Sequence, residues 1–89
     1  MKTTNHATVR CQQRGIPPLV IDLLLQFGCH EHDHSGAEIF YFDQRSRKRI
    51  ESYAGGIIRK LSEHLDSYAV VADGKIITVG TRFKRINHN

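Results

Sequence analysis

Hydrophobic positions in residues 18–27 recur at the spacing of one helical face. The apolar stripe consists of Leu19, Val20, Leu23, Leu24 and Phe27. Proline is tolerated in the first turn of a helix, so Pro17 and Pro18 suit its start, and Gly28 suits its end. The pattern therefore predicts a helix that packs into a hydrophobic core.

The segment before it, about residues 4–14, is mainly polar and predicts an earlier, more exposed helix. Thr4 or Asn5 can cap its first turn, because a short polar side chain accepts a hydrogen bond from the free backbone amides there. Gly15 can end it in the left-handed conformation. The chain is thus expected to begin with two helices.

After Cys29 the pattern changes from helical to extended. Residues 37–42 contain Ile39-Phe40-Tyr41-Phe42, a run that predicts a well-buried strand. A short additional strand is expected around residues 29–32. Tyr41 and Tyr68 could stack on nucleic-acid bases, although their apolar neighbours favour a place in the core.

A third helix is predicted over residues 46–65, with Asp43 or Ser46 as its cap. Its apolar positions keep a helical period, namely Ile50, Tyr53, Ala54, Ile57, Ile58, Leu61 and Leu65. Gly55 and Gly56 interrupt this period, and each costs about 1 kcal/mol relative to alanine inside a helix. A kink or a close backbone contact is expected there.

The pattern of residues 68–83 predicts a β-hairpin. Residues 68–72 and 75–83 would be its strands, joined by Asp73-Gly74, a pair that supplies the positive φ angles of a tight turn. Simple alternation divides the second strand between two faces. One face would carry Ile77, Val79, Thr81 and Phe83, and the other Ile76, Thr78, Gly80, Arg82 and Lys84.

The elements follow in the order α-α-β-α-β-β and predict an α+β fold, with three helices packed on a small antiparallel sheet that ends in a hairpin. The 89 residues, 39% of them hydrophobic, suffice for one domain with one modest core. No linker or repeat divides residues 1–89, so we expect a single domain.

The charge of the chain indicates a possible partner. Its 13 Lys and Arg residues outnumber its 9 Asp and Glu residues and give a formal net charge of +4. The excess lies in two clusters. The first comprises Arg45, Arg47, Lys48 and Arg49, and the second comprises Arg82, Lys84 and Arg85. Clustered cations attract phosphates, whereas scattered ones mainly increase solubility. Nucleic acid is therefore the expected partner, the alternative being that both clusters are simply solvated.

Other classes are disfavoured by the composition. The longest apolar stretch, residues 19–25, is interrupted by Asp22 and is far too short to span a bilayer, so no membrane partner is expected. Residues 1–13 are polar and do not resemble a signal peptide. Cys11 and Cys29 lack a paired spacing, which leaves a disulfide between them open. A cytoplasmic location follows as the expectation.

A histidine-rich run, Cys29-His30-Glu31-His32-Asp33-His34, offers candidate metal ligands. In an extended chain His30, His32 and His34 would share one side, and three imidazoles on one side could bind zinc or another divalent ion. The alternative, which we favour, is a solvated loop or sheet edge without a cofactor.

His6, Arg10 and Arg14 recur every four residues and would share one face of the first helix. Metal-independent RNA cleavage needs a proton carrier near neutral pH and cations on the phosphate. Histidine and arginine suit these two tasks. The competing interpretation is that these three residues form the solvent-exposed face of an amphipathic helix and have no catalytic role.

Three motifs together resemble a family of small bacterial and phage domains. They are His6-x3-Arg10-x3-Arg14-Gly15-Ile16, a helix ending in Gly28, and the hairpin Tyr68-Ala-Val-Val-Ala-Asp-Gly-Lys-Ile-Ile-Thr-Val-Gly80. That family is similar to RelE/ParE-type toxins, within the wider group that unites barnase, colicin nuclease domains and RelE (the BECR fold). The resemblance covers about residues 6–86.

The resemblance implies two N-terminal helices on an antiparallel sheet that meets RNA. His6, Arg10 and Arg14 match the helix motif, and Thr78, Arg82 and Lys84 match the end of the hairpin. Catalysis would fall to His6, Arg10, Arg14 and Arg82. When the clustered cations are added to these matches, nucleic-acid binding would fall to Arg45, Arg47, Lys48, Arg49, Thr78, Lys84 and Arg85. Relatives often carry a histidine where this chain has Thr81, and the helix over residues 46–65 departs from the plainest RelE layout.

Three functions are thus compared. The first is an RNA-directed domain with metal-independent endoribonuclease activity, which an antitoxin would control. The second is a non-catalytic binding or inhibitor protein of phage or plasmid origin, with a nucleic-acid-processing machine as its target. The third is a metal-binding protein built on His30, His32 and His34.

Overall fold

The computed structural model describes residues 2–33 and 35–81. Its elements, in chain order, are β1 (Lys2–Thr3), α1 (Asn5–Arg14), α2 (Pro18–Phe27), β2 (Cys29–His32), β3 (Glu38–Tyr41), α3 (Gln44–Ala54), α4 (Ile57–Lys60), the 3-10 turn η1 (Ser62–His64), β4 (Tyr68–Ala72) and β5 (Lys75–Gly80). The predicted α+β class is confirmed.

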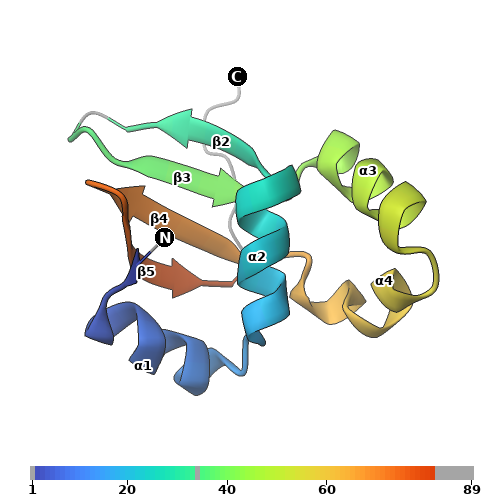
Figure 1. The fold of residues 1–89 in the computed structure, drawn as a ribbon, viewed down its shortest axis with the longest axis horizontal. Coiled ribbons are helices and arrows are strands. Elements are labelled where there is room, and N and C mark those ends of the chain that lie inside the picture. The colour runs from blue at the N-terminus through green and yellow to red at the C-terminus, as the bar shows by residue number, and fades with distance from the viewer. Residues whose placement is uncertain (1, 34, 82–89) are drawn as a thin grey trace.

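The strands form one five-stranded sheet in the order β1-β5-β4-β3-β2. Neighbouring strands are antiparallel from β5 to β2, whereas β1 runs parallel to β5. The prediction of a purely antiparallel sheet is therefore wrong at one edge, where two residues that sequence reasoning left out of any strand pair with Lys75 and Ile76. In Figure 1, α2 crosses the sheet, α1 lies beside β5, and α3 and α4 lie beyond the end of the sheet.

The first two helices begin and end as the sequence predicts. The Thr4 hydroxyl accepts a hydrogen bond from the backbone amide of Ala7, which caps α1, and Gly15 follows the helix in the left-handed conformation. Helix α2 starts at Pro18 and ends before Gly28. These boundaries were predictable because each depends on residues three or four positions apart.

The third helix is shorter than predicted. Asp43 caps α3 as expected, but the helix ends at Ala54, and Gly55 adopts a φ of 59°. The chain resumes as the short helix α4 and the turn η1. The single helix over residues 46–65 is therefore wrong, because the Gly55-Gly56 pair breaks it completely instead of kinking it.

The terminal hairpin is confirmed, with Asp73 and Gly74 at φ angles of 52° and 72° in its turn. The predicted alternation of faces in β5 is wrong, because Ile76 and Val79 are both buried. Val71 pairs with Ile76 and Val70 with Thr78, so a bulge at Ile77 shifts the register by one residue. Thr78 and Val79 still face opposite sides of the sheet.

One hydrophobic core lies between the helices and the sheet. Its buried members come from α1, α2, α3, β4, β5 and the connecting segments, and they include Ala7, Val20, Leu24, Phe42, Ile50, Ala69, Ile76 and Val79. Ile50 is the fully buried residue by which α3 packs on this core, and the partly buried Ala54 adds to the contact. The remaining faces of α3 are thereby left to solvent.

Candidate nucleic-acid interface

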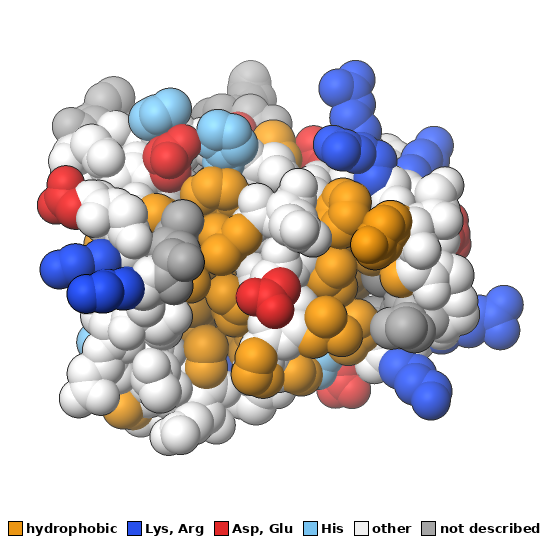
Figure 2. All heavy atoms as spheres, in the orientation of Figure 1, with side chains coloured by type: hydrophobic (Ala, Val, Ile, Leu, Met, Phe, Trp, Pro, Cys, Tyr) orange, Lys and Arg blue, Asp and Glu red, His pale blue; other side chains and the backbone are white. Residues whose placement is uncertain are grey.

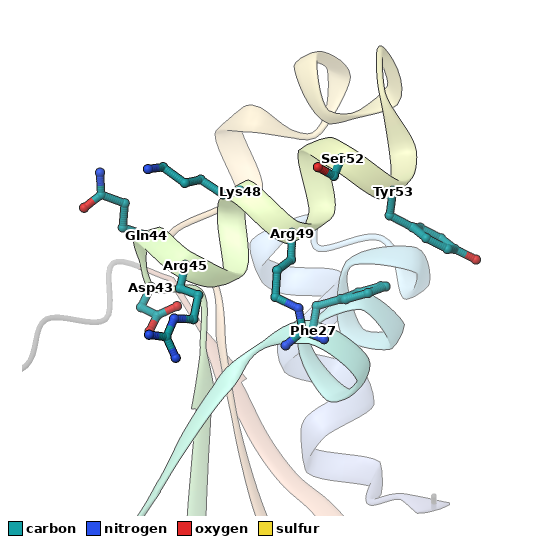
Figure 3. Close-up of a pocket in the computed structure, with 8 residues that line it drawn as sticks. All are labelled: Phe27, Asp43, Gln44, Arg45, Lys48, Arg49, Ser52 and Tyr53. Carbon is teal, nitrogen blue, oxygen red and sulfur yellow. The ribbon is translucent and has the colours of Figure 1, made fainter.

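The first predicted cation cluster lies on α3, and the helix divides it between two faces. Arg45 and Arg49 are one turn apart, and Lys48 lies beside them. All three line one surface hollow, and Figure 3 shows Arg45 and Arg49 pointing to the same side of α3 while Lys48 extends along the helix toward Gln44. Arg47, two positions from Arg45, lies on another side of the helix. Three of the four predicted contacts therefore come together and one does not.

Arg47 has a structural role instead. Its Nη2 donates a hydrogen bond to the backbone oxygen of Leu65 at 3.0 Å, and it lies 3.5 Å from a carboxylate oxygen of Asp66. These contacts connect α3 to the end of η1. The sequence pattern predicted Arg47 as a phosphate ligand because its hydrogen-bond partner, Leu65, lies 18 residues later and is not identifiable from local spacing.

The hollow is open and has a volume of about 880 Å³. Besides the three cations it is lined by Phe27, Asp43, Gln44, Ser52 and Tyr53. Phe27 reaches it from the last turn of α2, and the other residues come from α3 and its cap. Figure 2 shows the same arrangement from outside, with Lys and Arg side chains gathered over α3 beside a strip of hydrophobic surface.

The two aromatic rings of the hollow contact each other. Phe27 and Tyr53 have ring centroids 5.2 Å apart and an interplanar angle of 46°. The guanidinium of Arg49 lies 5.8 Å from the centre of the Phe27 ring, within the range of a cation–π contact. Phe27 is half-buried, whereas Tyr53 is 76% exposed. An exposed aromatic ring thus lines the same hollow as three positive charges.

The one carboxylate at the hollow already has partners. Asp43 Oδ1 accepts hydrogen bonds from the Ser46 hydroxyl at 2.6 Å and from the Ser46 amide at 2.8 Å. The hydroxyl bond, followed by the amide bond, lowers the pKa of Asp43 below its usual value, and the charge of Arg45 adds to this effect. Asp43 therefore stays ionised at neutral pH and serves as the cap of α3, and the cations still outnumber it.

Sequence reasoning missed the aromatic half of this site. It assigned Phe27 and Tyr53 to apolar stripes that would be buried. A signal was nevertheless present, because Arg45, Arg49 and Tyr53 follow one another at intervals of four and must share a helical face. The position of Phe27 depends on tertiary packing and had no comparable signal.

The predicted catalytic residues of α1 lie elsewhere. His6 and Arg14 are exposed and Arg10 is half-buried, on a helix at the opposite end of the molecule from α3. The second cation cluster (Arg82, Lys84 and Arg85) lies outside the described residues, so its meeting with His6 stays a prediction. Thr78 is half-buried and, opposite to Val79, lies on the sheet face away from the core.

Two of the three predicted metal ligands share a face of β2, as expected. His30 Nδ1 is 2.8 Å and His32 Nε2 is 3.4 Å from the same oxygen of Glu38 on β3, and the His30 ring stacks on Phe40. His34 lies outside the described residues. Within residues 2–33 and 35–81, no three His, Cys, Asp or Glu side chains are grouped so that they could hold a metal ion.

The other side of β2 carries a hydrogen-bonded cluster. The Tyr41 hydroxyl donates to Glu31 at 2.7 Å, and the Cys29 thiol donates to the Tyr41 oxygen at 3.5 Å. Burial, followed by these hydrogen bonds, raises the pKa of Tyr41. Tyr41 is thus a buried structural residue, as its neighbours indicated. Cys29 and Cys11 both carry free thiols.

No protein-family model, curated protein or solved structure matches this chain. The similarity to RelE-like domains therefore stays an expectation from the sequence. Among the described residues, none of the helices has the length and apolar character required to cross a bilayer.

Proposed function

We propose that this chain is a small RNA-binding domain and that it contacts RNA phosphates through the hollow on α3. The supporting observation is that Arg45, Lys48 and Arg49 all line one open hollow, while Arg47 is held by Leu65 and Asp66 on another side of the helix. Cations gathered on one surface raise the local potential, which is the electrostatic signature of a nucleic-acid contact.

The chemistry of the three side chains suits phosphate. Arginine can donate two parallel hydrogen bonds to a phosphate, and lysine contributes a flexible point charge. All three side chains are exposed, so they keep their hydration until the ligand arrives. Among the described residues, the only acidic side chain that lines the hollow is Asp43, which is hydrogen-bonded to Ser46 and places one negative charge near Arg45 against three cations.

Binding at this hollow does not require catalysis. The candidate proton carrier, His6, lies on α1, and Figure 1 shows α1 and α3 at opposite ends of the molecule. Cleavage by His6 would thus need a second contact surface on α1. The function proposed for the α3 hollow is binding, and nuclease activity is a separate hypothesis that a separate assay decides.

Fluorescence anisotropy with a labelled RNA of about 20 nucleotides tests the proposal. Affinity should fall steeply with salt, because each neutralised phosphate releases counterions, with a logarithmic slope of roughly 0.7–0.9 per contact. Lys48→Ala should weaken binding and reduce this slope by roughly one contact. Lys75→Ala removes the same charge from an exposed position at the start of β5 and is the matched control.

Two results would contradict the proposal. One is a flat salt response, and the other is an equal loss of affinity in Lys48→Ala and Lys75→Ala, which would show that only net charge matters. Incubating the same RNA with wild-type protein and with His6→Ala, followed by gel electrophoresis, decides the nuclease hypothesis. Cleavage that depends on His6 would support it, and intact RNA would leave binding as the function.

A further inference from the structure

We infer that the α3 hollow selects unpaired nucleotides, with one base stacked on Tyr53 while Arg45 and Lys48 hold the adjoining phosphates. This inference rests on the proposed RNA-binding function and names the strand state that the site would recognise. It comes from the aromatic half of the hollow, which phosphate binding alone does not use.

Tyr53 is placed where a base could reach it. It follows Arg49 by one helical turn, and 76% of its surface is exposed. Figure 3 shows its ring extending from the end of α3, on the side of the helix where Arg49 reaches toward Phe27. One side of the ring meets Phe27, so the remaining aromatic surface faces solvent.

The contacts around Phe27 hold this platform in position. Phe27 is half-buried at the end of α2 and packs against the core, and it contacts both the Tyr53 ring and the Arg49 guanidinium. A ring held by neighbours loses less conformational entropy when a ligand stacks on it. The arrangement is thus suited to stacking before any ligand binds.

Stacking distinguishes single strands from duplexes. In a duplex, each base is covered by the neighbouring base pairs, and only its edges are accessible in the grooves. An unpaired base exposes a π-face that an aromatic side chain can cover, and such stacking tolerates any sequence. Cations alone would bind single-stranded and duplex RNA alike. The Tyr53 ring beside the cations therefore favours the single strand.

An acidic peptide is the main competing ligand. Its carboxylates would pair with Arg45, Lys48 and Arg49, but they would gain little from the face of Tyr53. The electron-rich face of an aromatic ring attracts cations instead of carboxylates. The combination of ring and cations therefore favours a nucleotide, which brings a flat base together with its phosphate.

The test compares a single-stranded RNA of about 12 nucleotides with a duplex of the same sequence, by anisotropy at matched salt. Tyr53→Ala should weaken single-strand binding by about five- to ten-fold and leave duplex binding and the salt slope unchanged. Tyr53→Phe should bind like the wild type, because the ring is retained. Lys48→Ala should weaken both RNAs and reduce the slope.

A 2-aminopurine placed in the single strand gives a second readout. Its fluorescence should be quenched on binding to the wild type and to Tyr53→Phe, and less so with Tyr53→Ala. Since Tyr53 is largely exposed, circular dichroism should be the same for all variants, and Tyr53→Ala should unfold only slightly earlier than the wild type because it loses its ring contact with Phe27.

The outcomes separate the two proposals. If Tyr53→Ala weakens neither RNA, or weakens both equally, the selection of unpaired bases is overturned while RNA binding stands. If neither RNA binds with the expected dependence on Lys48 and salt, the proposed function itself fails. If poly-glutamate competes as well as the single strand and Tyr53→Ala has no effect, the hollow is an electrostatic surface for acidic proteins, which also overturns this inference.

Discussion

The guanidinium of Arg47 donates a hydrogen bond to the carbonyl oxygen of Leu65 at 3.0 Å. This contact connects the first half of α3 to the end of η1, and Asp66 lies 3.5 Å from the same nitrogen. The bond explains why Arg47 differs from the other three basic residues of α3. It also makes Arg47 and Lys48 a pair whose substitutions should have opposite consequences.

Arg47→Ala should lower the free energy of unfolding by about 0.5–1.5 kcal/mol, the usual contribution of one hydrogen bond, with little from the exposed ion pair. At a temperature where the variant is folded, its RNA affinity should change little beyond the effect of one lost charge. Lys48→Ala should instead weaken RNA binding and leave the free energy of unfolding nearly unchanged. Urea unfolding and anisotropy measure the two effects, and a pair of variants with equal losses in both would contradict the assignment.

Asp43→Ala should cost about 1 kcal/mol, because it removes the cap of α3 and leaves the Ser46 amide without its acceptor. Asp43→Asn retains an oxygen that can cap and is the matched control. Because the pKa of Asp43 is lowered in the folded protein, its contribution is fully present above the usual carboxyl pKa. That contribution is lost as the pH falls below about 4, and the wild type should lose more stability there than Asp43→Ala. Urea unfolding between pH 7 and pH 3 provides the measurement.

Gly28→Ala should destabilise the fold by about 1–3 kcal/mol. A β-carbon at this position would collide with the backbone oxygen of Leu24 and lie 3.1 Å from that of Tyr41, and backbone atoms cannot move aside cheaply. Gly56→Ala is the control, because its β-carbon would meet no atom within 4 Å. Thermal unfolding should separate the two, and equal melting temperatures would contradict this clash because they would show that the backbone around Gly28 can shift to admit a β-carbon.

Tyr41→Phe should lower stability by about 0.5–1.5 kcal/mol through the loss of its hydrogen bond to Glu31. Burial raises the pKa of Tyr41 in the folded protein, so its contribution is present below pH 10 and is lost as the pH rises through the higher folded value. Absorbance at about 295 nm should therefore show one tyrosine that ionises well above pH 10. The variant should lack that step, and an unchanged titration would contradict the placement of this side chain.

The elements that sequence reasoning found depend on short-range signals. The cap at Thr4, the proline start of α2 and the Asp73-Gly74 turn each involve residues a few positions apart. The elements that it missed depend on distant partners. Strand β1 exists because Lys2 and Thr3 pair with residues more than 70 positions later, and the bulge at Ile77 is set by the fit of β5 to β4.

The candidate site shows the same division. Composition identified the cations of α3 as a group, but only the structure separates Arg47 from the other three. The helical period placed Tyr53 on the face of Arg45 and Arg49, yet a tyrosine at such spacing is equally typical of a core stripe. Tyr53 is exposed because α3 packs on the core through Ile50. This packing is a tertiary contact that cannot be predicted from local sequence spacing.

The pairing of β1 with β5 also has a consequence for how the chain is made. Strand β1 pairs with β5 and α1 packs against it, so residues 2–14 lack these contacts until β5 has been synthesised. On a ribosome, the β2–β3 hairpin can form early because its contacts are local, whereas closure of the N-terminal segment must wait. Nascent chains stalled before residue 75 should leave that segment open to proteases, and chains that carry β5 outside the exit tunnel should protect it.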